Sequence, residues 1–181
     1  MSLLDVRASI VTALTAALPA GTSVQAHRGR FDSAAEIQKF AAKAPAVLVA
    51  CVRAGLRGPG QGLAQMPASW AIYVITRDIP QMPRDAGAIA LVEALMLQVS
   101  GNCWGRTDIS APSDVQAQNL YAGSIDTLGV ALWAVTFEQL VTDPMVDATT
   151  LNDFVTFHQD IDMAPADGQI DITETDTLPQ Q

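Results

Sequence analysis

The chain has 181 residues, and its 19 acidic residues against 10 Lys and Arg give a net charge of −9 at pH 7. This length is enough for one domain with an ordinary hydrophobic core plus an appendage. The basic residues are few and scattered, which argues against a direct nucleic-acid partner, because phosphate binding needs clustered Lys or Arg. Two cysteines without C-x-x-C spacing exclude a disulfide-dense scaffold and favour a reducing compartment.

The first segment, residues 2–18, is predicted to be an amphipathic helix rather than a signal peptide. Asp5 precedes Arg7, so the positively charged start of a signal peptide is missing, and the apolar residues recur at helical spacing. Ser2 with Asp5 three residues later is a capping-box pattern. No apolar run reaches the roughly 18 residues that a membrane-spanning helix needs, so we expect a soluble chain without a membrane partner.

A short extended piece at 24–26 precedes a second helix. This helix begins at Ser33, which forms a capping-box pattern with Glu36, and ends before Pro45 because proline cannot continue a helix. The next seven residues, AVLVACV, are an uninterrupted apolar run rich in valine. Such a short run predicts a strand that is buried on both faces.

The segment 53–67 holds four glycines and two prolines and is predicted to be a long, exposed hairpin loop before a strand at 68–78. Loops beyond about 12 residues in compact domains are usually functional or disordered. Arg53 and Arg57 in this loop are therefore candidate contacts with an acidic surface of a partner. The alternative is a flexible hairpin end without a binding role.

The longest predicted helix begins at Pro83 and ends near Gly101, and Glu93 in its middle is expected to face solvent. Two further strands are predicted at 113–125 and 127–141. Sequential antiparallel strands with segregated helices predict an α+β fold, with a mostly antiparallel sheet and the helices packed on one face.

An extended acidic arm, 142–181, is predicted to follow the α+β domain at 1–141. The arm holds nine acidic residues and no Lys or Arg, so it carries the whole net charge of the chain. Its mixture of acidic and apolar residues is typical of a segment that folds on binding. Phe154, Phe157 and Ile161 are the candidate contacts with another subunit or partner, and packing on the arm's own domain is the alternative.

The sequence predicts neither a metal site nor a catalytic site. Four aspartates of the arm supply hard oxygen ligands at short range, but Ala164 and Pro165 stand where an EF-hand needs an oxygen ligand and a glycine. His27 and His158 each lack a second histidine at ligand spacing. No phosphate-binding loop or nucleophile–base pattern is present. We therefore expect no cofactor and no enzymatic activity.

The stretches HRGRF and EIQKFAAKAPAVLVACV, with the acidic end DFVTFHQDIDMAPADGQIDITETDTLPQ, resemble a family of Mu-like phage and prophage tail terminator proteins over nearly the whole chain. The resemblance implies a homohexameric ring on the head-proximal end of the tail tube, in the neck of the virion, after assembly in the host cytoplasm. It implies the tube protein and the head–tail connector as partners, with DNA only passing through the lumen.

Two alternatives to a tail terminator stay open. One is another structural protein of the neck, such as a head–tail joining or tail-completion protein with the same general fold. The other belongs to a different class, a small ligand-binding α+β domain. Binding of tube ends, rather than of small molecules, separates these classes.

Overall fold

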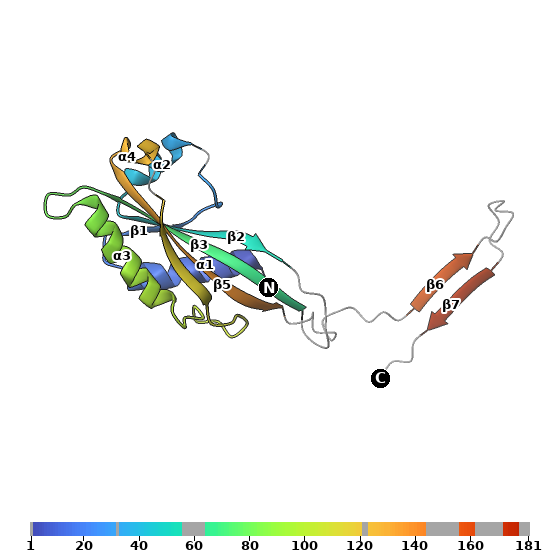
Figure 1. Cartoon of the computed structure of the whole chain (residues 1–181). Coiled ribbons are helices and arrows are strands. Elements are labelled where there is room, and N and C mark those ends of the chain that lie inside the picture. Colours follow the sequence, from blue (N-terminus) through green and yellow to red (C-terminus); the bar gives the residue numbers. More distant parts are fainter. Residues whose placement is uncertain are drawn as a thin grey trace. The chain divides into compact units, whose positions relative to one another are not determined.

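The computed structural model describes residues 2–31, 33–55, 64–120, 123–143, 156–161 and 172–177. The chain divides into two compact units, Met1–Pro144 and Met145–Gln181, which we call the body and the C-terminal unit. Figure 1 shows the elements of both units in chain order. In the described residues, no helix has the length and apolar character needed to cross a membrane.

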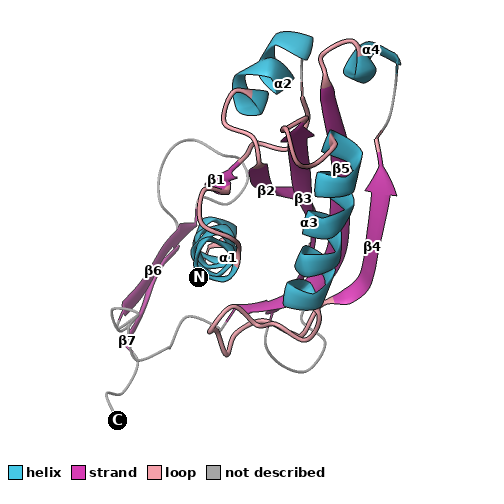
Figure 2. Ribbon diagram, turned by 90° about the vertical axis from the view of Figure 1, so that its left-hand side faces the viewer, coloured by secondary structure: helices cyan, strands magenta, loops and turns pink. Residues whose placement is uncertain are grey.

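The body is built on one sheet of five strands. The strands lie in the order β1-β2-β3-β5-β4, and every pair is antiparallel except β1 with β2 (Figure 2). The prediction of an α+β fold with a mostly antiparallel sheet is confirmed. The elements are α1 (Leu3–Ala17), β1 (Ser23–Ala26), α2 (Ala34–Ala41), β2 (Ala46–Ala54), β3 (Ala64–Arg77), α3 (Arg84–Val99), β4 (Ser113–Asn119), α4 (Gly123–Asp126) and β5 (Val130–Asp143).

The two faces of the sheet are covered by different helices. Val47 and Val49 of β2 belong to a core shared with α1 and α3, whereas Leu48 between them packs in a second cluster with Ile37 of α2 and Ile125 of α4. The prediction that the helices pack on one face therefore holds for the two long helices, α1 and α3, and not for the short ones. The short helices lie on the opposite face, because strands that are apolar on both faces need a cover on each.

The helices begin and end where local signals place them. The Ser2 side chain accepts hydrogen bonds from the backbone N–H groups of Leu4 and Asp5, and Ser33 accepts one from Glu36. Gly101 follows the end of α3 with φ of +71°, a conformation that glycine adopts without strain. The predicted boundaries of α1 and α3 are confirmed to within two residues, whereas α2 ends at Ala41, three residues before the last position that Pro45 allows.

The predicted hairpin loop at 53–67 is wrong at both ends. β2 continues to Ala54, and β3 already begins at Ala64, where it pairs with Asp143 of β5. The long ladder with β5 holds this polar, proline-containing part of β3 in extended conformation. Arg53 accordingly lies in β2 opposite Ser69 rather than in a loop, while Arg57 lies outside the described residues.

Two other boundaries also differ from the sequence prediction. The strand expected at 113–125 ends at Asn119, and the short helix α4 replaces its second half. β5 runs to Asp143, two residues past the expected end of the domain. Glu93 is exposed on α3, as predicted.

In the C-terminal unit, β6 (Thr156–Ile161) and β7 (Ile172–Thr177) form a two-stranded antiparallel ladder. The ladder runs from the pair Thr156 and Thr177 to the pair Ile161 and Ile172. We call this ladder the C-terminal hairpin. Phe157 and Ile161, two of the predicted contact residues, are part of β6, whereas Phe154 lies outside the described residues.

Candidate partner-binding site

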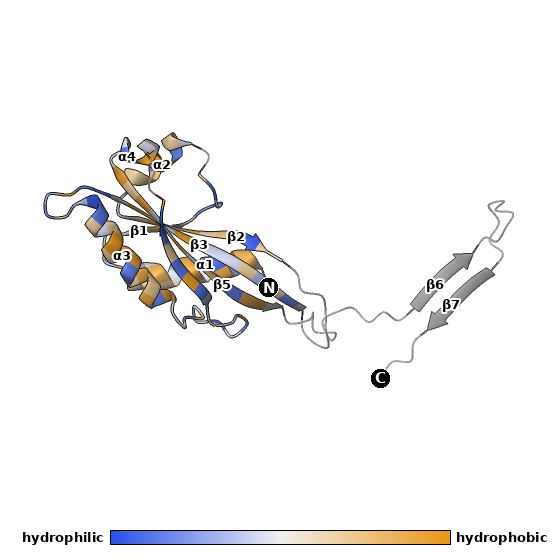
Figure 3. Ribbon diagram, in the orientation of Figure 1, coloured by the Kyte–Doolittle hydropathy of each residue, from blue (hydrophilic) through white to orange (hydrophobic). Residues whose placement is uncertain are grey.

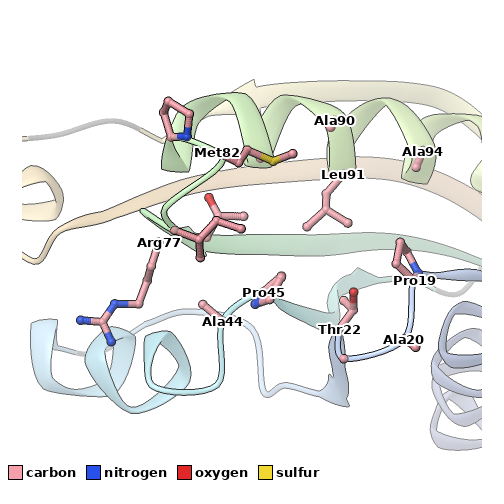
Figure 4. Close-up of a pocket in the computed structure, with 15 residues that line it drawn as sticks. Pro19, Ala20, Thr22, Ala44, Pro45, Arg77, Met82, Ala90, Leu91 and Ala94 are labelled. Atoms are coloured by element: carbon pink, nitrogen blue, oxygen red, sulfur yellow. The ribbon is translucent and has the colours of Figure 1, made fainter.

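An apolar cavity of about 370 Å³ opens at the end of the sheet where β3 leads into α3. Three separate segments line it (Figure 4): the turn after α1, the residues just before β2, and the stretch from the end of β3 into α3. Pro19 lies in the first of these segments, Pro45 in the second and Leu91 in the third. Because no single segment contains the cavity, only the tertiary fold creates it.

A tight turn between β3 and α3 forms one rim of the cavity. The backbones of Ile79 and Met82 exchange two hydrogen bonds, with N···O distances of 3.1 and 3.0 Å. The Asp78 carboxylate accepts a hydrogen bond from the backbone N–H of Arg84, and the Thr76 hydroxyl donates one to the Arg84 carbonyl. These bonds fix the turn to both the strand and the helix.

The rim presents large apolar side chains to solvent. Ile79 is 55% exposed and Met82 is 42% exposed. Met82 also lies close to α3, since a Cβ atom added at Gly87 would meet its Sδ atom at 3.3 Å. Hydrophobic residues recur along α3 (Figure 3), and Ala90, Leu91 and Ala94 among them line the cavity. Clustered exposed apolar side chains of this kind mark protein interaction sites.

The charged residue at the cavity is Arg77, at the end of β3. Its side chain is exposed, and no carboxylate of the described residues forms an ion pair with it. The cavity is thus suited to an apolar group that carries a nearby acidic residue. Such a group would gain both hydrophobic burial and a charge partner.

The ionisable residues of the body interact in small groups at separate places. Arg106 donates two hydrogen bonds to Asp108, at 2.9 and 2.7 Å, and these bonds lower the pKa of the Asp108 carboxyl. Arg84 pairs with Asp126 of α4. Within the described part of the chain, no group of three His, Cys, Asp or Glu is placed to bind a metal ion.

His27 is a structural residue of the body. Its ring is buried and packs against the rings of Phe31, Phe40 and Tyr73, with centroid distances of 4.7 to 6.0 Å. Its Nδ1 atom accepts a hydrogen bond from the backbone N–H of Gly29. This arrangement fixes the chain between β1 and α2.

The predicted contact residues and the cavity are different parts of the molecule. Arg53 lies in β2 and is exposed, but it does not line the cavity. The rim residues Ile79 and Met82 were not predicted, although a signal was present, because DIPQMP places two large apolar residues in a turn between a strand and a helix.

No family model matches the chain, and neither does any curated protein. A functional proposal therefore rests on the surfaces of the body, on the acidic C-terminal unit and on the resemblance of the sequence to tail terminators.

Proposed function

We propose that the protein is a phage tail terminator. Six copies form a ring on the head-proximal end of the tail tube, end tube polymerisation and present a face to the head–tail connector. The observation that carries the proposal is the apolar rim of Ile79 and Met82, which a rigid turn holds exposed beside a cavity. The sequence resemblance over nearly the whole chain supports it.

The mechanism is steric. A ring that covers the last layer of tube subunits occupies the surface that the next layer needs, so elongation stops without any chemical step. DNA passes through the lumen of the ring, and the acidic C-terminal unit repels it where that unit faces the lumen.

The rim is suited to this contact for two physical reasons. Interface cores are enriched in apolar side chains, and methionine adapts its flexible thioether to an irregular partner surface. The hydrogen-bonded turn also holds the rim in place before binding, which reduces the conformational entropy lost on association.

A tube-polymerisation assay tests the proposal. Purified protein added to polymerising tube protein should give shorter tubes that carry a ring at one end in electron micrographs. Met82→Asp should remove this effect, because a carboxylate on the rim opposes burial. Leu4→Asp is the matched control, since Leu4 is also an exposed apolar residue, at 64% against 42% for Met82, and lies in the first turn of α1, where an acidic residue is tolerated.

Two results would contradict the proposal. Tubes of unchanged length in the presence of wild-type protein would exclude a terminator. Protein that joins heads to tails without ending polymerisation would identify the alternative, another neck or tail-completion protein. Capping by Met82→Asp at the wild-type level would exclude the rim as the tube contact.

A further inference from the structure

The two ends of the apolar cavity differ in chemistry. Figure 4 shows Arg77 and Ala44 toward one end of the cavity, and Pro19 and Ala94 toward the other. An occupant that spans the cavity therefore meets a cation at one end and apolar side chains at the other. The occupant that matches this arrangement is an apolar group with a negative charge at one end.

The wall between these two ends offers little to a polar occupant. All of the lining residues are glycine or apolar, except Thr22, Thr76 and Arg77. The Thr76 hydroxyl already donates a hydrogen bond to the Arg84 carbonyl at 2.6 Å, so its proton is not available to an occupant. Because a buried polar group without a partner costs free energy, the part of the occupant that enters the cavity is hydrocarbon.

The cavity has room because α3 carries small residues on this side. Gly87, Ala90 and Ala94 lie three and four positions apart, a spacing that places them on one face of the helix. At Gly87, an added Cβ atom would already approach the Met82 Sδ atom to 3.3 Å. A large side chain at Ala94 would instead fill the end of the cavity that Arg77 does not occupy.

The charge of Arg77 is available to a partner. Its side chain is exposed, and it forms no ion pair with a carboxylate of the described residues. The carboxylate next in sequence, that of Asp78, is engaged with Arg84 instead. One of its oxygens accepts a hydrogen bond from the Arg84 backbone N–H at 2.9 Å, and the other lies 4.0 Å from the Arg84 Nε atom.

The exposed rim favours a side chain of a protein over a free small molecule. A small molecule that fills the cavity leaves Ile79 and Met82 exposed, at 55% and 42%. A protein that inserts one side chain covers these two residues as well. Interfaces gain most of their binding energy from such anchors, which fill a pocket and are surrounded by contacts that exclude water.

We propose that one large apolar side chain of the tail-tube protein inserts into the cavity, and that an Asp or Glu beside it in the tube protein pairs with Arg77. This inference rests on the proposed terminator function and deepens it, because the inserted side chain, and not contact with the rim alone, then anchors the ring on the tube. Arg77 orients the anchor, since only one direction of insertion brings the carboxylate to the cation.

A cavity-filling variant tests the insertion. Ala94→Phe should weaken binding to isolated tail tubes at least about tenfold in cosedimentation, because the anchor can no longer enter. Ala35→Phe is the matched control: it adds the same ring at an exposed position of α2 outside the cavity and should bind as the wild type does. Ala90→Leu, at an exposed alanine of the same wall, replaces Ala94→Phe if that variant proves unstable in urea denaturation.

A charge reversal tests the carboxylate of the partner. Arg77→Glu should weaken tube binding by about tenfold, because like charges then meet at the contact, whereas Arg77→Lys should retain most of it. Arg53→Glu makes the same reversal at an exposed residue that does not line the cavity, and it should leave tube binding unchanged.

Decanoate probes the cavity without tubes, because it joins an apolar chain to one carboxylate. Calorimetry should show that the wild type binds decanoate more tightly than decylammonium, and that Arg77→Glu reverses this preference. Saturating decanoate should also block binding of the wild type to tubes, since it occupies the place of the anchor.

Four results would overturn the proposal. Tube binding at the wild-type level by the cavity-filling variant would exclude insertion, and the same result for Arg77→Glu would exclude the carboxylate. Decanoate that does not bind would exclude the assigned chemistry, and decanoate that binds without blocking tubes would identify a free alkyl carboxylate as the occupant. If the wild type still caps tubes in these cases, the terminator function stands. Wild-type protein that neither binds nor caps tubes would overturn both.

Discussion

The two faces of the body's sheet differ in what they bury. The face under α1 and α3 buries Trp70 and Phe137, the largest fully buried side chains of the body. The opposite face is closed by α2 and α4 at one end only and then carries the small residues Ala71 and Ala134, which line a hollow together with Arg28 and Arg30. The first face therefore supplies the stability of the fold, and the second offers surface for association.

The largest expected effect is on the free energy of unfolding, and it should differ between two neighbouring residues of β5 that lie on opposite faces of the sheet. Phe137→Ala should lower the free energy of unfolding by about 3–5 kcal/mol, because it leaves a cavity in the core. Thr136→Val, on the opposite face, should change it by less than about 0.5 kcal/mol, since Thr136 is exposed. Urea denaturation measures both, and similar losses at the two positions would contradict the distinction.

A smaller effect on the free energy of unfolding is expected for a buried hydrogen bond on the sheet face under α1 and α3. The Trp104 indole N–H donates to the Gln139 side-chain oxygen at 2.9 Å, and both residues are buried. Trp104→Phe should cost about 1–3 kcal/mol of unfolding free energy, because it leaves a buried acceptor without its donor. Denaturation of this variant at pH 7 gives the value, and a loss no larger than that of Thr136→Val would be inconsistent with a buried bond.

The Asp108 carboxylate links stability to pH. Arg106 lowers its pKa in the folded body, so this stabilisation is present above the unfolded pKa near 3.8 and is lost as the pH falls through the lower, folded value. Asp108→Asn should cost up to about 1 kcal/mol at pH 7, because the pair is partly solvated. Denaturation at pH 7 and at acidic pH should show the difference between variant and wild type shrinking below about pH 4. A difference that grows on acidification would show that the sign is wrong.

The smallest expected effect on stability is at Arg30, which lines a hollow on the sheet face opposite α1 and α3. Arg30→Glu should change the unfolding free energy by less than about 0.5 kcal/mol, because Arg30 is exposed and forms no ion pair in the described residues. Urea denaturation of the variant and the wild type measures the difference. A variant that unfolds easily would instead mean that Arg30 supports the fold.

Local sequence signals predict much of this fold. Ser2, Ser33 and Gly101 mark helix ends because capping depends on residues within one turn, and the apolar run at 46–52 predicts β2 because burial on both faces requires such a run. The extended start of β3 could not be predicted, since its ladder with β5 joins residues more than seventy positions apart.

The candidate binding surfaces could be predicted less well from the sequence than the fold. The apolar cavity combines residues near positions 20, 45 and 76–94, which only the tertiary fold brings together. Phe157 and Ile161 were predicted as contacts from composition, but only the structure shows that their strand pairs with β7. Pairing register depends on the partner strand, which one segment of sequence does not contain.

The most direct measurement of the central claim is native mass spectrometry of the full chain over a concentration series, with and without isolated tail tubes. A ring of six 19.1-kDa copies gives a species near 115 kDa, alone or bound to tubes, and we expect this species. A monomer at every concentration that ignores tubes would contradict the proposed function.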